Sequence, residues 1–265
     1  MTAILEQWVG LSHPVIGMVH LAPLPGSPRF AGDLDAVIDA AVADARTWQA
    51  VGAQGLMMEN FGDVPFFKDD VPSETVDTMT KVAGEIRSAV PDLPLGINVL
   101  RNDGLSALNI AAAVGASYIR VNVLNGAAVT DQGIIEGRAA EIMRYRQTLG
   151  ADIKVFADVR VKHAAPLAER PLQDEVEELV HRAGADAVIV SGTGTGKPTD
   201  PSHAAEVKQY AGGTPVLIGS GADASSIPQL RPACDGFIVG SAAKPGGKID
   251  QPVDLSLAKQ IIGAN

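Results

Sequence analysis

Short apolar runs recur along the chain, and each is bounded by Gly, Pro, Asn or Asp. Within the runs polar and apolar positions do not strictly alternate, a pattern typical of strands that are buried on both faces of a sheet. The pattern predicts eight strands, at residues 15–20, 55–59, 94–100, 117–123, 153–159, 186–192, 215–221 and 235–241.

Helical patterns lie between these strands. The segment 34–53 is rich in Ala and repeats apolar residues at helical spacing, and the segment 73–90 shows the same period. Further helices are predicted at 103–116, 133–151, 172–185 and 200–212. The dipeptide Gly-Ala ends four of these segments, and glycine suits the left-handed turn after a helix, here at Gly52, Gly115, Gly150 and Gly184.

Strands that alternate with helices indicate a parallel sheet covered by helices. Eight strands close a (β/α)₈ (TIM) barrel, and 265 residues fit one such domain over 1–265. Residues 1–12 are expected to form a lead-in helix that caps the barrel bottom. A doubly wound open sheet is the alternative, but the proline-rich segment 17–28 after the first strand carries no dinucleotide fingerprint.

Polar residues end almost every predicted strand, where the chemistry of such barrels is located. A carboxylate among them, Glu59 or Asp158, could act as general base if burial raises its pKa. A histidine or lysine could polarise or protonate an oxygen, although His20 could also simply fill the barrel top. The third strand also runs into Arg101–Asp103. The candidates for catalysis are His20, Glu59, Asn98, Arg120, Asn122, Asp158, Lys162 and His163.

The glycine-rich segments 218–223 and 238–244 resemble the paired loops after strands seven and eight that bind phosphate in many barrels. Glycines let the backbone approach an anion, although they could also serve only tight turns. The segment 191–200 fails the P-loop spacing and is expected to be an active-site loop or lid. Lys244 could add a positive charge. The residues expected to hold a phosphorylated ligand are Ser191, Thr193, Gly194, Thr195, Gly196, Gly219, Ser220, Gly221, Gly240 and Ser241.

Two further features leave alternatives open. A divalent metal could be held by His20, Glu59, Asp158 and His163, although no local ligand spacing supports it, and no other cofactor is expected.

The segment 59–70 places phenylalanines among acidic residues in a loop. These rings could cover the site, bury against a second subunit, or pack on the chain's own barrel.

Composition narrows the partners. The formal net charge of −10 argues against nucleic acid and anionic membranes. The single cysteine, Cys234, cannot form an intrachain disulfide and suits a reducing compartment. No signal peptide is evident, and the uncharged stretch 104–119 is shorter than the ~20 residues that a membrane helix needs. We expect a cytoplasmic homo-oligomer with a small phosphorylated ligand and no integral membrane association.

Seven segments together resemble the BtpA/SgcQ family over nearly the whole chain. They are GMVHLAPLPGSP, ENFGDVPF, GINVLRND, SYIRVNVLNGA, ADVRVKHAAPL, GADAVIVSGTGTGKPTD and DGFIVGSAAK. The resemblance implies a phosphate-binding TIM barrel. Its two branches are a photosystem I biogenesis factor and SgcQ-type proteins that resemble sugar-metabolism proteins. The family-like segments contain the strand-end candidates above and also Asn60 and Asp63.

These observations favour an enzyme that acts on a small phosphorylated metabolite such as a sugar phosphate. The expected reaction is proton abstraction next to a carbonyl, as in an isomerase, epimerase or lyase. Two alternatives remain at this point. One is a non-catalytic assembly or stability factor of the photosystem I biogenesis type, and the other is a metal-dependent nucleotide or nucleoside hydrolase.

Overall fold

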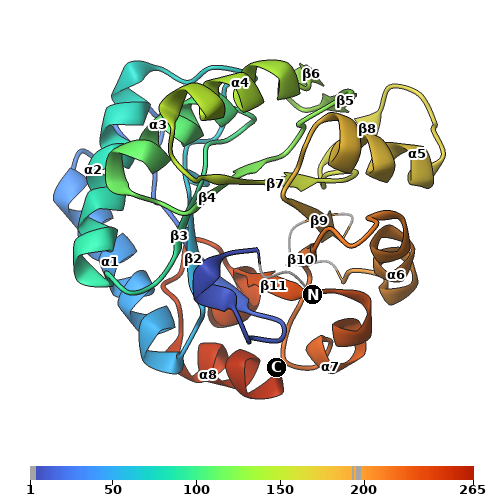
Figure 1. Ribbon diagram of the computed structural model, residues 1–265. Coiled ribbons are helices and arrows are strands. Elements are labelled where there is room, and N and C mark those ends of the chain that lie inside the picture. Colours follow the sequence, from blue (N-terminus) through green and yellow to red (C-terminus); the bar gives the residue numbers. More distant parts are fainter. Residues whose placement is uncertain (1–3, 193, 195–197) are drawn as a thin grey trace.

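The centre of the molecule is a closed barrel of eight parallel strands (Figure 1). The computed structural model describes residues 4–192, 194 and 198–265. Each predicted strand is confirmed, and the last strand pairs with the first to close the ring. The barrel strands are β1 (Val15–His20), β2 (Gly55–Glu59), β3 (Leu95–Asn98), β4 (Tyr118–Val121), β7 (Lys154–Asp158), β9 (Ala187–Ser191), β10 (Val216–Ser220) and β11 (Gly236–Val239).

Helices surround the barrel (Figure 1). Asp33 caps the first of them by accepting a hydrogen bond from the backbone N of Ala36 at 2.9 Å. The four glycines predicted to follow helices all have a positive φ. The helices are α1 (Leu34–Val51), α2 (Ser73–Ala89), α3 (Gly104–Val114), α4 (Ala139–Leu149), α5 (Leu172–Glu177) with a π-helical turn (Glu178–Arg182), α6 (Pro201–Tyr210), α7 (Ile227–Leu230) and α8 (Leu255–Ala264).

The barrel interior is apolar in its lower layers. Tyr118 and Phe156 stack with their ring centroids 4.6 Å apart, and the Tyr118 hydroxyl donates to the carbonyl of Leu56 at 2.6 Å. Ile16, Met57 and Leu217 are among the side chains that pack in the same interior cluster. Because these residues fill the lower barrel, the polar strand-end residues are confined to its upper end.

The N-terminal segment closes the barrel bottom, but not as the helix expected over 1–12. Within its described part it forms a 3₁₀ turn, Glu6–Trp8. The Trp8 ring lies 5.8 Å from Tyr118 and 6.4 Å from Phe156, and its indole N–H donates to the carbonyl of Gln54 at 2.7 Å. One buried tryptophan therefore does the capping for which the sequence suggested a helix.

A small antiparallel sheet stands at the upper end of the barrel, in the order β6-β5-β8. It comprises β5 (Ala127–Thr130), β6 (Gly133–Glu136) and β8 (Ala164–Pro166), which follow β4 and β7. The helix predicted over 133–151 was therefore wrong in its first part. A tight turn at Gly133, with φ 99°, starts β6, and Ile134 and Ile135 face opposite sides, one exposed and one buried. The helix begins only at Ala139.

Candidate functional site

Four polar side chains stand directly opposite one another on adjacent strands. The register pairs His20 with Glu59, Glu59 with Asn98, and Asn98 with Arg120. Glu59, Asn98 and Arg120 are buried, and the His20 side chain is 7% exposed. We call these four residues the rim. Strand pairing alone thus brings together candidates that lie as much as 100 residues apart in the sequence (120 − 20).

Glu59 lies between two rim partners. One of its carboxylate oxygens accepts a hydrogen bond from the Asn98 amide, and the other lies 4.0 Å from Nε2 of His20. Burial, followed by the charges of Lys244, Lys162 and Arg120, lowers the pKa of His20 well below its usual 6.5. His20 is therefore a neutral imidazole at neutral pH and has one ring N–H to donate beside the Glu59 carboxylate.

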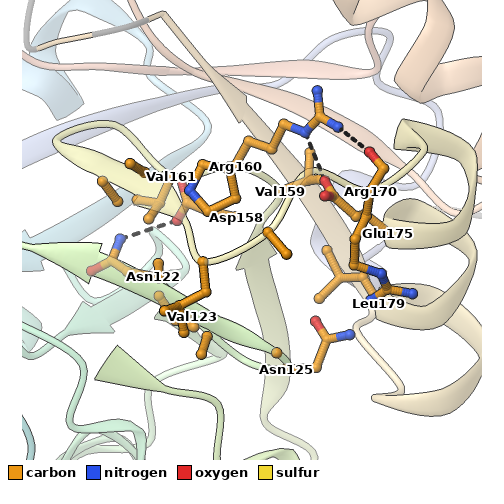
Figure 2. A pocket seen from close by; sticks show the side chains of 18 residues that line it. Asn122, Val123, Asn125, Asp158, Val159, Arg160, Val161, Arg170, Glu175 and Leu179 are labelled. Atoms are coloured by element: carbon orange, nitrogen blue, oxygen red, sulfur yellow. Dashed lines mark hydrogen bonds and ion pairs between the residues drawn. The ribbon is translucent and has the colours of Figure 1, made fainter. Parts of the chain in front are cut away.

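Asp158 is held by three neighbours. Arg120 donates to both of its oxygens, from Nε at 2.8 Å and from Nη2 at 2.7 Å. Asn122 donates at 3.1 Å, as Figure 2 shows, and the Ser191 hydroxyl lies at 3.4 Å. Burial alone would lower the pKa of Arg120, but Asp158 raises it. This carboxylate is engaged as a counter-ion.

Lys162 and His163 reach the site from the segment after β7. The carbonyl of Lys162 accepts a hydrogen bond from Nη2 of Arg101 at 2.8 Å, which fixes the segment against the loop after β3. Burial, followed by the charge of Arg120, lowers the pKa of Lys162. An amine with a lowered pKa beside two carboxylates is suited to proton transfer or to stabilising negative charge.

A cavity of about 420 Å³, which we call the site cavity, has Glu59, Arg120 and Lys162 in its wall. Phe66 lies in its wall, so this ring of the 59–70 segment covers the site, whereas Phe67 is 55% exposed. Phe61 also stands there, with its ring edge-on to His20 at 5.3 Å. The full lining is Glu59, Phe61, Phe66, Leu100, Arg101, Arg120, Asn122, Asp131, Lys162 and His163.

The glycine-rich strand ends lie beside the rim. A narrow space of about 20 Å³ has His20, Glu59, Arg120 and Lys162 in its wall. The rest of the wall includes Gly219, Ser220, Gly221, Gly240 and Ser241. Part of the glycine requirement comes from packing, because a Cβ on Gly240 would lie 2.6 Å from the His20 ring.

Lys244 does not supply the free positive charge that the sequence suggested. Its side chain is buried, with Nζ 3.2 Å from the Asp44 carboxylate and 2.6 Å from the carbonyl of Gln251. Asp44 in turn accepts a hydrogen bond from the backbone N of Val253 at 2.8 Å. The ion pair therefore fastens the segment after β11 to α1.

Several residues that the sequence pointed to do not line the site cavity. Asn60 and Asp63 hold loops together, because Asn60 accepts from the backbone N of Leu100 at 2.7 Å and Asp63 accepts from the backbone N of Leu24 at 2.8 Å. Gly194 is buried. Thr193, Thr195 and Gly196 lie outside the described residues.

The proposed metal ligands do not form a metal centre. Within residues 4–192, 194 and 198–265, no three His, Cys, Asp or Glu side chains converge as a metal ion would require. The chemistry of the set agrees with this, since Asp158 is occupied by Arg120, and Glu59 and Nε2 of His20 are 4.0 Å apart. The metal-dependent hydrolase therefore has no ligand set among the residues described.

Arg101 is the main site residue that the sequence did not assign. It is buried, it lines the site cavity, and burial lowers the pKa of its guanidinium. Its position just after a strand end was a visible signal. The hydrogen bond from Arg101 to the carbonyl of Lys162 gave no such signal, because the two residues are far apart in the sequence.

A closed parallel barrel with a polar rim at its carboxyl end defines a TIM-barrel protein. The sequence profile of the BtpA family matches residues 11–265, and the chain belongs to this family. The resemblance found in the motifs is thus confirmed. In the described part of the chain, no helix combines the length and apolar character needed to cross a bilayer.

Two relatives in sequence and one solved structure of the same fold are similar to this chain. The chain is 49% identical over 249 residues to an uncharacterized protein of Thermococcus kodakarensis, covering 94% of each chain. It is 48% identical over 242 residues to the photosystem I biogenesis protein BtpA of Synechocystis, covering 91% of this chain and 84% of that one. The phosphoribosyl anthranilate isomerase of Thermus thermophilus shares the fold, with a TM-score of 0.56 at 10% identity and coverage of 95% and 97%.

Proposed function

We propose that this protein is an enzyme that acts on a small phosphorylated metabolite, such as a sugar phosphate, by abstracting a proton next to a carbonyl group. The reaction class is that of an isomerase, epimerase or lyase. The observation that carries the proposal is the setting of Glu59. Its carboxylate lies in the cavity wall, is oriented by Asn98, and has the neutral His20 ring 4.0 Å away.

Of the two carboxylates expected as base, the geometry favours Glu59. Asp158 already accepts two hydrogen bonds from Arg120 and one from Asn122, so its lone pairs are engaged. Glu59 is oriented by a neutral amide, which leaves its charge available to take a proton. Asp158 is then a positioning residue that holds Arg120 in the rim.

Two groups can stabilise the oxygen on which negative charge develops. The neutral His20 ring can donate a hydrogen bond to it, and the Lys162 ammonium can stabilise its charge in a site partly shielded from water. Both line the same narrow space as Glu59. Gly221 and Ser241 line that space and also a wider one of about 480 Å³, which supports binding of a phosphate group in the wider space.

Ligand binding is tested by thermal shift with a set of phosphorylated sugars and nucleotides, with and without divalent metal. A binder should raise the melting temperature with the logarithm of its excess over the dissociation constant. Gly221→Asp should abolish the shift by placing a carboxylate in the anion site. The matched control is Gly52→Asp, since Gly52 also has a positive φ (86°, against 79°) but ends α1. The proposal fails if no phosphorylated compound shifts the wild-type protein.

The chemistry is tested by hydrogen exchange. A bound sugar phosphate incubated with the protein in D₂O should gain deuterium at the carbon next to its carbonyl, observed by NMR. Glu59→Gln should stop the exchange and retain binding, because the amide oxygen can still accept from Asn98. Exchange at the wild-type rate in Glu59→Gln would remove Glu59 from the role of base.

Exposed apolar side chains favour a second candidate, a non-catalytic assembly role, in keeping with the biogenesis role for which the Synechocystis relative is named. Val129, Ile134 and Leu167 are 43%, 47% and 54% exposed, and Phe67 is 55% exposed. The first two are direct cross-strand neighbours on the outer face of the small sheet. Such a row is suited to burial against another protein surface, including a second copy of this chain.

Light scattering of the purified protein tests this candidate through self-association. A homo-oligomer built on the small sheet should dissociate in Ile134→Glu. The control is Leu255→Glu, which should leave the oligomer intact, because Leu255 is similarly exposed (56%) but is the first residue of α8. An oligomer unchanged by Ile134→Glu, or a wild-type monomer, would contradict self-association through this sheet.

A further inference from the structure

A second cavity, which we call the second chamber, has Asn122 and Asp158 in its wall (Figure 2). Its volume is about 440 Å³. It lies between the segment after β4, the segment after β7, and α5. Nothing in the proposed proton abstraction uses it, although its size is within the range of small-molecule sites, about 300–1,000 Å³.

The surface of the second chamber is mainly apolar. Val123, Val159, Val161 and Leu179 are buried side chains in its wall. A row of alanines, Ala164 to Ala168 interrupted by Pro166 and Leu167, forms another side. Small side chains along one wall leave room that larger residues would fill.

The charged groups of this wall are engaged with one another. Arg160 donates from Nε to Glu175 at 2.7 Å and from Nη2 to the carbonyl of Arg170 at 2.9 Å (Figure 2). Arg170 donates to Glu178 at 2.8 Å. The polar contacts therefore tie α5 to the segment after β7, and what remains for an occupant is chiefly apolar surface.

The second chamber and the site cavity meet at Asn122, which lines both. Asp158, which holds Arg120, also lines the second chamber. Between them runs the segment 160–163, with Arg160 and Val161 on one side and Lys162 and His163 on the other. A ligand that spans the two cavities would thus pass Asn122.

The dividing segment is held in an unusual backbone conformation. Arg160 and His163 have φ values of 50° and 57°, in the left-handed region that non-glycine residues rarely adopt. Strain of this kind concentrates at functional sites, where the surrounding structure fixes a required geometry. Here the geometry gives one short segment a face toward each cavity.

We propose that the second chamber binds an apolar ring of the same ligand whose phosphorylated part reacts at the rim, so that the substrate class is a phosphorylated sugar joined to an aromatic or aliphatic ring. The proposal rests on the proposed function for the phosphorylated half. An apolar cavity of about 150 Å³ is sufficient for benzene, so this chamber has room for a larger ring.

Indole, observed by ligand-detected NMR and titrated against the full-length protein, is the probe. It should bind the wild-type protein, and Ala168→Trp, which places an indole ring in the chamber from an exposed lining position, should weaken binding at least about tenfold. The matched control is Ala140→Trp, an exposed alanine on α4 outside the chamber lining. Melting curves establish that both variants fold.

The outcomes separate the two proposals. If indole does not bind, or binds Ala168→Trp as well as the wild type, the second chamber is not a ring site. If indole binding follows the chamber but no phosphorylated sugar shifts the melting of any variant, the ring site stands and the phosphorylated half of the ligand is wrong. If both bind, Ala168→Trp should lose indole and keep the shift with a sugar phosphate that lacks a ring substituent.

Discussion

Loss of either partner of the Arg120–Asp158 ion pair should destabilise the protein strongly. Their side chains are 2% and 0% exposed and share two hydrogen bonds of 2.7 and 2.8 Å. Removing one member of a buried pair leaves an uncompensated charge and costs about 3–5 kcal/mol. We expect Asp158→Leu and Arg120→Met each to lower the free energy of unfolding by this amount, a large part of a total that is typically about 5–15 kcal/mol.

The double variant measures the interaction energy between Arg120 and Asp158 apart from their contacts with other residues. With both charges gone, Arg120→Met with Asp158→Leu should lose less than the two single variants together, by about 2 kcal/mol or more. Urea denaturation followed by tryptophan fluorescence measures each value, and equal slopes would show that the denatured states are comparable. Strictly additive losses, or an Arg120→Met loss below about 1 kcal/mol, would refute the reasoning.

Three further outcomes are expected. Burial and nearby cations lower the pKa of His20. Below pH 6.5 this imidazole is therefore protonated in the unfolded chain while it stays neutral in the folded protein. Stability should therefore be complete above pH 6.5 and fall below it, and His20→Gln should flatten that part of a denaturation profile. Gly96→Ala places a Cβ 2.0 Å from the Tyr118 ring and should cost about 1–3 kcal/mol or more, whereas Gly84→Ala meets nothing within 4 Å and should gain about 0.5–1 kcal/mol in the same assay. Gly240→Ala should displace the His20 ring, seen as a changed imidazole NMR shift, and should weaken sugar phosphate binding; an unchanged shift would contradict the contact.

The barrel could be predicted because its signal is local and repeated. Each strand is a short apolar run between turn residues, and the run that ends at His20 looks the same whether or not its neighbours are known. Strand order then follows from the (β/α)₈ pattern, and the polar strand ends must meet at one edge. The convergence of His20, Glu59, Asn98 and Arg120 is a direct consequence.

What the sequence could not predict depends on partners far along the chain. Lys244 reads as an available cation until Asp44, 200 residues earlier, is seen beside it. Asp158 reads as a free base until Arg120 is placed against both of its oxygens. The small sheet was missed because its strands have only three or four residues, and because β8 pairs with β5 across a long interval, as Pro166 does with Ala128.

The seam of the barrel lies between its first and last strands, where Val15 pairs with Phe237. The chain ends are fastened below it, because His13 contacts the carbonyl of Arg231 at 3.0 Å and the amide of Asn265 donates to the carbonyl of His13 at 2.7 Å. During synthesis, β1 must therefore wait with an unpaired edge until the final strand has left the ribosome. Ring closure is consequently a late, long-range event, and nascent chains present a template for association that the finished protein conceals.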